Sequence, residues 1–247
     1  MKTLISGFGM MGQKIYHALK NDDDFEIIGV VSREFNQTVE EPMYKTFKEC
    51  KDQAEMIIDF SNPNNLDDLL DYALTNQTKL VLATTGFTND QLNKIEEASK
   101  EIAIFQSYNT SLGVQMLTKI LKEVAKEFYD NYFDIEILER HHNQKIDAPS
   151  GTDKLLYEIM EEEIKETRPV YDRSQVTKKR EREEIGIQAL RGGTIFGEHE
   201  VMFAGKDEIV SIKHTALSKD VFVQGAVHAT KLLTNKKKGL YTLKTLY

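Results

Sequence analysis

The stretch Lys2-Thr-Leu-Ile-Ser-Gly-Phe-Gly-Met-Met-Gly12 decides the fold. Its apolar start predicts a short strand, its glycines follow the pattern G-x-G-x-x-G, and the spacing of later apolar residues predicts a helix. Residues 25–31 predict the next strand. This order is typical of a dinucleotide-binding βαβ unit, in which Gly7 permits a tight turn, Gly9 admits a pyrophosphate and Gly12 allows close packing. A purely structural glycine turn is the alternative.

Strands and helices continue to alternate beyond this unit. The sequence patterns predict strands over residues 56–60, 80–84 and 102–106, and helices over residues 62–75 and 88–99. Such alternation indicates a parallel, doubly wound sheet that binds ligands at the carboxyl ends of its strands. Small and polar segments follow these predicted ends, namely Asp59–Ser61, Ala83–Phe87 and Ser107–Thr110. The same residue types also favour ordinary turns, so their shared position is what suggests a function.

The end of the second predicted strand bears on the choice of cofactor. An acidic residue there would bind the ribose hydroxyls of NAD, whereas an arginine can accept the 2′-phosphate of NADP. Ser32 and Arg33 follow Val31, with Glu34 one place later. We therefore favour NADPH, with NADH as the alternative. The alternative is that Arg33 is an ordinary exposed loop residue.

The pattern changes after Asn109 and predicts a second domain. Ser111 is a candidate cap for a long helix with apolar residues at helical spacing up to Phe128. Strands are predicted over residues 132–138, 185–190, 194–203 and 209–215, and helices over 152–167 and 220–233, while the charged residues 168–184 give no clear pattern. The predicted fold class is α/β, with a Rossmann-like doubly wound dinucleotide-binding domain (1–110 and 219–247). The other domain (111–218) is an α+β substrate-binding and oligomerisation domain with a mixed or antiparallel sheet.

The second domain is predicted to contain about four strands with helices on one face. An uncovered sheet face needs a partner, because large exposed apolar surfaces are rare on monomers. We therefore predict a homo-oligomer, a homotetramer, assembled through this sheet.

Composition narrows the classes of function. The net charge of −8 argues against broad nucleic-acid binding. No apolar run is long enough to span a membrane, no cleaved signal is evident, and the single cysteine excludes an internal disulfide. These features predict a cytoplasmic protein without membrane or nucleic-acid partners, and no metal site is predicted.

A candidate anion site lies in Glu139-Arg-His-His-Asn-Gln-Lys-Ile-Asp-Ala-Pro-Ser-Gly-Thr152. His141, His142 and Lys145 place three potential cations within five positions, just before a predicted helix N-terminus. Positive charge and exposed helix N–H groups suit a small anion that carries carboxylates or phosphate. The alternative is one core histidine, one surface histidine and a surface lysine.

These residues resemble the dihydrodipicolinate reductase family, whose members are also called 4-hydroxy-tetrahydrodipicolinate reductases. The resemblance covers nearly the whole chain and is most specific at residues 134–152. Further matching segments are Gly7–Gly12, Asp59-Phe60, Thr84–Phe87, Asn109, Ser111, Gly113-Val114, Arg191–Gly193, Gly197–His199 and Gly225–Val227. The resemblance implies NAD(P)H-dependent reduction of 4-hydroxy-tetrahydrodipicolinate, a small cyclic dicarboxylate, to tetrahydrodipicolinate with loss of water. This reaction belongs to lysine and diaminopimelate biosynthesis.

The resemblance also implies roles for particular residues. His141 matches the catalytic proton donor or acceptor, and Lys145 matches the second proton donor. His142, Gly151 and Thr152 match substrate-binding positions. The implied cofactor-binding residues are Gly7, Phe8, Gly9, Met10, Met11, Gly12, Ser32, Arg33, Ala83, Thr84, Thr85, Ser107, Tyr108, Asn109 and Thr110. Histidine is the side chain that usually titrates near neutral pH, which suits protonation of a ring after hydride addition.

Four features depart from the family pattern, and the first is the compact glycine loop Gly7–Gly12, which is longer in many members. Asn143-Gln144 replace a basic pair, Ala83 replaces a glycine, and Ser32 stands where an acidic residue is common. The last departure weakens the case for NADH. Two alternatives stay open: another two-domain NAD(P)-dependent dehydrogenase of amino acids or semialdehydes, and a non-catalytic nucleotide-sensing protein of the same fold.

Overall fold

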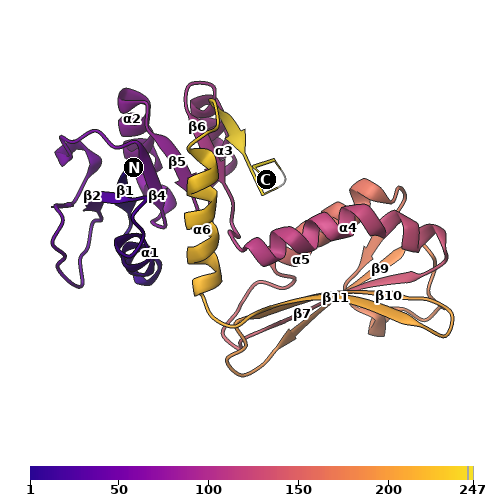
Figure 1. Cartoon of the computed structure of the whole chain (residues 1–247). Coiled ribbons are helices and arrows are strands. Elements are labelled where there is room, and N and C mark those ends of the chain that lie inside the picture. The colour runs from indigo at the N-terminus through magenta and orange to yellow at the C-terminus, as the bar shows by residue number, and fades with distance from the viewer. Residues whose placement is uncertain (244, 247) are drawn as a thin grey trace. The chain divides into compact units, whose positions relative to one another are not determined.

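The computed structural model describes residues 1–243, 245 and 246. The chain forms two compact units (Figure 1). The first comprises Met1–Ser111 with Asp220–Tyr247, and the second comprises Leu112–Lys219.

The first unit contains a parallel sheet of seven strands in the order β12-β6-β5-β4-β1-β2-β3. The strands are β1 (Lys2–Ser6), β2 (Glu26–Val31), β3 (Met43–Tyr44), β4 (Met56–Asp59), β5 (Lys79–Leu82), β6 (Ala103–Gln106) and β12 (Gly239–Tyr241). β1 pairs with β2 on one side and β4 on the other, so the chain order reverses there. In open α/β sheets this reversal marks the edge where ligands bind.

Helices cover both faces of this sheet. α1 (Met10–Lys20) and α6 (Asp220–Leu233) pack on one face, and α2 (Leu66–Asn76) and α3 (Asn89–Ser99) on the other. Short 3₁₀ turns lie at Phe47–Glu49 and Pro63–Asn65. Two buried clusters, one on each face, account for the nearly continuous apolar composition of the central strands. The doubly wound prediction is confirmed.

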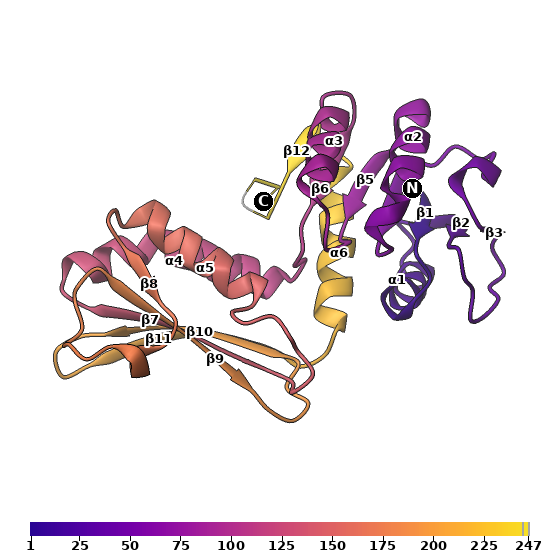
Figure 2. The same ribbon diagram turned by 180° about the vertical axis from the view of Figure 1, so that it is seen from behind.

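The second unit contains a mixed sheet of five strands in the order β11-β10-β7-β9-β8. The strands are β7 (Asp134–His141), β8 (Arg168–Val170), β9 (Glu184–Arg191), β10 (Gly197–Ala204) and β11 (Ile209–Ala216). β10 runs antiparallel to both neighbours, whereas β7, β8 and β9 are parallel. α4 (Leu112–Asp130) and α5 (Gly151–Glu163) lie together on one face of this sheet (Figures 1 and 2), and a 3₁₀ turn spans Arg173–Gln175.

Some predicted elements were wrong in extent. The strand expected over 132–138 is β7, which continues to His141, so Glu139 and His141 lie on a strand and not in a loop. The second sheet has five strands where four were expected, because β8 is only three residues long and shows no apolar alternation. The sequence analysis also missed β3 and β12, which are short strands at the two edges of the first sheet. Figure 2 shows β12 beside β6.

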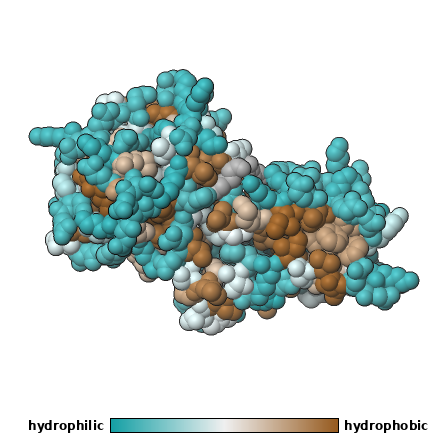
Figure 3. Space-filling view, in the orientation of Figure 1, coloured by the Kyte–Doolittle hydropathy of each residue, from teal (hydrophilic) through white to brown (hydrophobic). Residues whose placement is uncertain are grey.

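The sheet face of the second unit that carries no helix combines charged and apolar side chains. Arg140 pairs with Glu198 and Glu200 at 3.4 and 3.3 Å. Leu190 and Ile209 remain 48% and 64% exposed on the same face. Elsewhere, hydrophilic residues cover most of the surface seen in Figure 3, with apolar patches between them. Within the described residues, no helix has the length and apolarity needed to cross a membrane.

Candidate active site

The glycine motif adopts a nucleotide-binding geometry. Gly7 has φ +86°, and a Cβ there would lie 2.5 Å from the Phe60 carbonyl oxygen. A Cβ on Gly12 would lie 1.9 Å from the Gly7 carbonyl oxygen, so only glycine allows α1 to pack this closely. By contrast, a Cβ on Gly9 would meet nothing within 4 Å. Gly9 is the N-cap residue of α1. No side chain caps this helix, and its first turn has no acidic residue. This terminus therefore fits a phosphate group.

The polar segments after β4 and β5 are linked beneath this motif. Asp59 is 2% exposed, and burial raises the pKa of its carboxyl group despite hydrogen bonds from neighbouring hydroxyls. Ser61 Oγ donates to Asp59 Oδ1 at 2.6 Å, and Ser61 N donates to Thr84 Oγ1 at 2.8 Å. Ala83 N donates to the Asp59 carbonyl at 2.9 Å. Thr85 is exposed at the same edge.

The segment after β6 is fixed against α6. Thr110 Oγ1 donates to the Phe222 carbonyl at 2.6 Å, and Ser107 Oγ donates to the Asn109 carbonyl at 2.5 Å. Tyr108 is 54% exposed between them. Since these segments follow adjacent parallel strands, they lie at the carboxyl edge of the sheet with the glycine motif.

The residues proposed to choose the cofactor follow β2 at this edge. Ser32 N donates to the Tyr44 carbonyl at 2.9 Å, and Ser32 Oγ donates to the Glu34 carbonyl at 2.8 Å. Both bonds stabilise the turn after β2. Arg33 is exposed next to it, whereas Phe8 in the glycine motif is buried at 1%.

In the second unit, the candidate catalytic histidine lies on the helix-covered face of the sheet. β7 alternates strictly, so Ile135, Ile137, Glu139 and His141 all point to this face. His141 is 8% exposed and Glu139 is fully buried. Glu139 Oε2 and His141 Nδ1 form a hydrogen bond.

Glu139 is held by three groups. Ser150 N donates to Oε1 at 2.8 Å, and the two terminal nitrogens of Arg191 contact Oε2 and Oε1 at 3.1 and 3.0 Å. Burial alone would raise the pKa of Glu139, but hydrogen bonds from His141, Arg191 and Ser150 outweigh it and lower the pKa to about 2. The carboxylate is therefore ionised at neutral pH.

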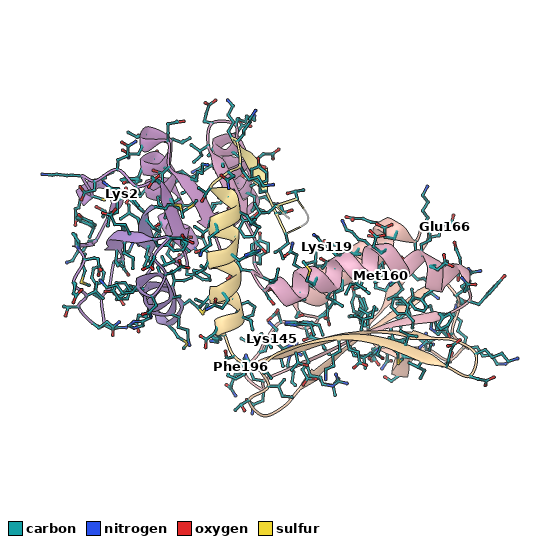
Figure 4. All side chains as sticks on the ribbon, viewed as in Figure 1. Lys2, Lys119, Lys145, Met160, Glu166 and Phe196 are labelled. Atoms are coloured by element: carbon teal, nitrogen blue, oxygen red, sulfur yellow. The ribbon has the colours of Figure 1, made fainter. Side chains whose placement is uncertain are left out.

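Lys145 lies at the same end of this sheet as Phe196 (Figure 4). Its Nζ contacts both carboxylate oxygens of Asp147, at 2.7 and 2.9 Å, and its side chain is 21% exposed. The sequence suggested locally concentrated positive charge. The structure instead pairs both His141 and Lys145 with carboxylates.

A second histidine–carboxylate pair lies beside the first. His199 Nδ1 is 2.6 Å from Asp153 Oδ1, and both residues are buried. The rings of His141 and His199 have centroids 5.1 Å apart. Burial raises the pKa of Asp153, although the hydrogen bond with His199 opposes this. Four ionisable side chains thus meet here, one of them from the first turn of α5.

The N-terminus of α5 borders this cluster. Ser150 caps the helix, since its Oγ accepts from Asp153 N at 3.2 Å. Gly151 is exposed, and a Cβ there would meet nothing within 4 Å, so a ligand can approach its backbone. Thr152 is 9% exposed and His142 is half-buried. The second unit therefore brings His141, Lys145 and the start of α5 together.

Sequence reasoning assigned no role to Glu139, Asp153, Arg191 or His199. The signal for Glu139 was its spacing of two from His141, but the predicted strand ended too early to use it. Arg191 and His199 come from β9 and β10, and only the strand pairing places them beside β7. Among the described residues, no three or more His, Cys, Asp or Glu side chains are grouped so that they could hold a metal ion.

Family models match both halves of the chain. A model described as "Dihydrodipicolinate reductase, N-terminus" matches residues 1–110, and "Dihydrodipicolinate reductase, C-terminus" matches residues 113–246. The chain belongs to the dihydrodipicolinate reductase family. This confirms the resemblance seen in the sequence, and with it an oxidoreductase that uses a pyridine nucleotide.

Full-length relatives carry the same name. The 4-hydroxy-tetrahydrodipicolinate reductase of Exiguobacterium sibiricum is 48% identical over 248 residues, covering 100% of this chain and 96% of that protein. The Staphylococcus aureus enzyme is 46% identical over 246 residues and covers 100% of both. The solved structure of dipicolinate-bound dihydrodipicolinate reductase from Paenisporosarcina sp. TG-14 has a TM-score of 0.81 at 22% identity, covering 98% of this chain and 97% of that one. This structural similarity supports the assignment of the fold.

Proposed function

We propose that this member of the dihydrodipicolinate reductase family reduces 4-hydroxy-tetrahydrodipicolinate to tetrahydrodipicolinate, as a step of lysine and diaminopimelate biosynthesis. The overall change adds one hydride and one proton to the substrate and releases one water. The observation that carries the proposal is the cluster of His141, Lys145 and the α5 N-terminus in a chain whose relatives bear the name of this enzyme.

The first unit, with residues 1–110 and 219–247, would bind the cofactor. Gly7–Gly12 would hold the pyrophosphate, because Gly9 leaves open space at the uncapped start of α1. The segments 83–85 and 107–110 would line the nicotinamide end of the site. Arg33 would contact the 2′-phosphate, which favours NADPH over NADH. When bound, the pyridine nucleotide supplies the hydride.

The second unit, residues 111–218, would bind and protonate the substrate. His141 would deliver a proton from Nε2, because its Nδ1 is engaged by Glu139. Lys145 would either hold a substrate carboxylate or donate a proton, exchanging Asp147 for the substrate. Gly151 and Thr152 would bind the other carboxylate through the α5 N-terminus, with His142 beside it. The Paenisporosarcina relative binds dipicolinate, which supports a dicarboxylate ligand.

Association into a homotetramer through the helix-free face of the second sheet is part of the proposal. The exposed Leu190 and Ile209 and the paired charges around them on this face would meet the same surface of another copy. A single monomeric mass in light scattering at micromolar concentration would refute this. A cytoplasmic location likewise stays a prediction.

The activity is tested by coupling the purified chain to the preceding synthase, with aspartate semialdehyde and pyruvate as its substrates. Loss of nicotinamide absorbance is expected with NADPH and should require both the synthase and this chain. The His141→Gln variant is expected to bind NADPH normally but to turn over far more slowly. Absence of NADPH and NADH oxidation by a folded, nucleotide-binding protein would overturn the assignment.

A further inference from the structure

One guanidinium group joins the two segments that carry the proposed proton donors. Arg191 donates from its terminal nitrogens to both oxygens of Glu139, the partner of His141. The same side chain donates from Nε to the Lys145 carbonyl at 3.3 Å and from Nη2 to the Asp147 carbonyl at 2.5 Å. The strand that carries His141 and the loop that carries Lys145 are therefore both hydrogen-bonded to the guanidinium group of Arg191.

We propose that Arg191 and Glu139 form a positioning unit that holds both proton-donating side chains, His141 and Lys145, in one fixed arrangement. The inference rests on the proposed function, to which it adds two residues that do not themselves touch the substrate. Glu139 sets the tautomer and ring orientation of His141. Arg191 sets the position of the loop that carries Lys145.

The tautomer follows from the charge of Glu139. An ionised carboxylate can only accept hydrogen bonds, so His141 Nδ1 must carry the hydrogen in their contact. In the neutral ring, Nε2 then has a free lone pair. Nε2 is therefore the atom that takes up a proton from solvent, and the resulting imidazolium delivers that proton to the substrate. Gly197 leaves room there, since a Cβ on it would lie 3.1 Å from His141 Nε2.

The loop position follows from the shape of the guanidinium group. Its planar fork offers several donors at fixed angles, so it can bind two carboxylate oxygens and two carbonyl oxygens at once. A lysine in place of Arg191 has one flexible ammonium group and cannot make these contacts together. Arg191 is opposite His141 in the pairing of β7 with β9, so its side chain starts close to both Glu139 and the Lys145 loop.

A purely structural ion pair is the competing explanation, and the same sheet supplies a comparison. Glu184, at the other end of β9, is 1% exposed and pairs with Arg168 and Arg173. It contacts none of the candidate catalytic residues. Glu184→Gln is therefore the matched control for removing a buried carboxylate from an arginine pair.

The first test reads the His141 ring by NMR of ¹⁵N-histidine-labelled protein, with the His141→Gln variant used for assignment. Neutral His141 is expected to carry its hydrogen on Nδ1 in the wild-type chain and in Glu184→Gln. In Glu139→Gln a mixture or the opposite tautomer is expected. This readout needs no substrate, so it stands even if the proposed reaction fails. An unchanged tautomer in Glu139→Gln would overturn the inference.

The second test separates kcat from KM. Glu139→Gln is expected to lower kcat about 100-fold with KM nearly unchanged, because a misplaced proton donor costs about this much. Arg191→Lys is expected to lower kcat by a similar factor and also to raise KM, since the Lys145 loop is released. Both variants should bind NADPH as the wild type does. Near-normal kcat in both, or an equal loss in Glu184→Gln, would refute a positioning role.

Discussion

Replacing Glu139 by glutamine should destabilise the second unit in a pH-dependent way. The structure lowers the pKa of Glu139 from 4.5 to about 2, because the hydrogen bonds from His141, Arg191 and Ser150 outweigh the effect of burial. Each tenfold change in an equilibrium constant corresponds to about 1.4 kcal/mol, so the ionised form contributes about 3 kcal/mol to folding. Glutamine has nearly the same shape but no charge, and the variant should lose about this amount at pH 7.

The direction of the pH dependence follows from the lowered pKa. The folded state favours ionised Glu139, so the stabilisation is complete above pH 4.5, the ordinary pKa, and is lost as the pH falls toward about 2. Protonated glutamate and glutamine are both neutral. The stability difference between the wild type and Glu139→Gln should therefore be constant from pH 7 to 5 and then shrink toward zero.

Native-state hydrogen exchange of peptides from β7 and β9 measures this difference without interference from the first unit. Each variant is compared with the wild type at the same pH, so intrinsic exchange rates cancel. Glu158 is exposed on α5, and Glu158→Gln should change stability by less than about 0.5 kcal/mol at every pH. A difference for Glu139→Gln that stays constant down to pH 3 would show that packing, not ionisation, produces the loss.

Three further predictions concern the first unit. Gly12→Ala should destabilise the unit and abolish nucleotide binding, because its Cβ would lie 1.9 Å from the Gly7 carbonyl oxygen. Gly9→Ala should fold normally, as measured by thermal melts, but should bind nucleotide more weakly. Arg33→Ala should weaken NADPH binding more than NADH binding in fluorescence titrations, and equal losses would refute the phosphate contact. Lys79 Nζ contacts three carbonyl groups at the C-terminal end of α6, so Lys79→Met should cost about 1–2 kcal/mol in urea unfolding; no change would refute the cap.

The sequence predicted the first unit well because local signals agree there. The glycine motif, the βα alternation and the apolar strands all indicate one architecture, and α6 begins and ends at the predicted residues. The second unit gave weaker signals. β8 is only three residues long. The parallel pairing of β7 with β9 joins segments more than forty residues apart, which no local pattern reveals.

The candidate site shows the same division. His141 and Lys145 were recognisable because they stand close together before a helix start. Arg191 was not, since its contacts with Glu139 and the Lys145 loop depend on β9 lying next to β7. Residue type suggested the proton donors, but only the tertiary structure identifies what holds them.

Along the helix-covered face of β7, apolar core residues are followed by the ionisable residues of the candidate site. Ile135 and Ile137 bury apolar side chains against the helices, which is what a sheet built for stability alone would continue to do. Glu139 and His141 occupy the next two positions on the same face, and both are buried. Burying an ionised carboxylate is unfavourable unless its lone pairs are satisfied, and a well-packed apolar residue often gives equal or greater stability. A charged pair in this position is therefore better explained by its effect on the His141 ring, and the partners that make its burial tolerable, above all Arg191, are the groups that align the site.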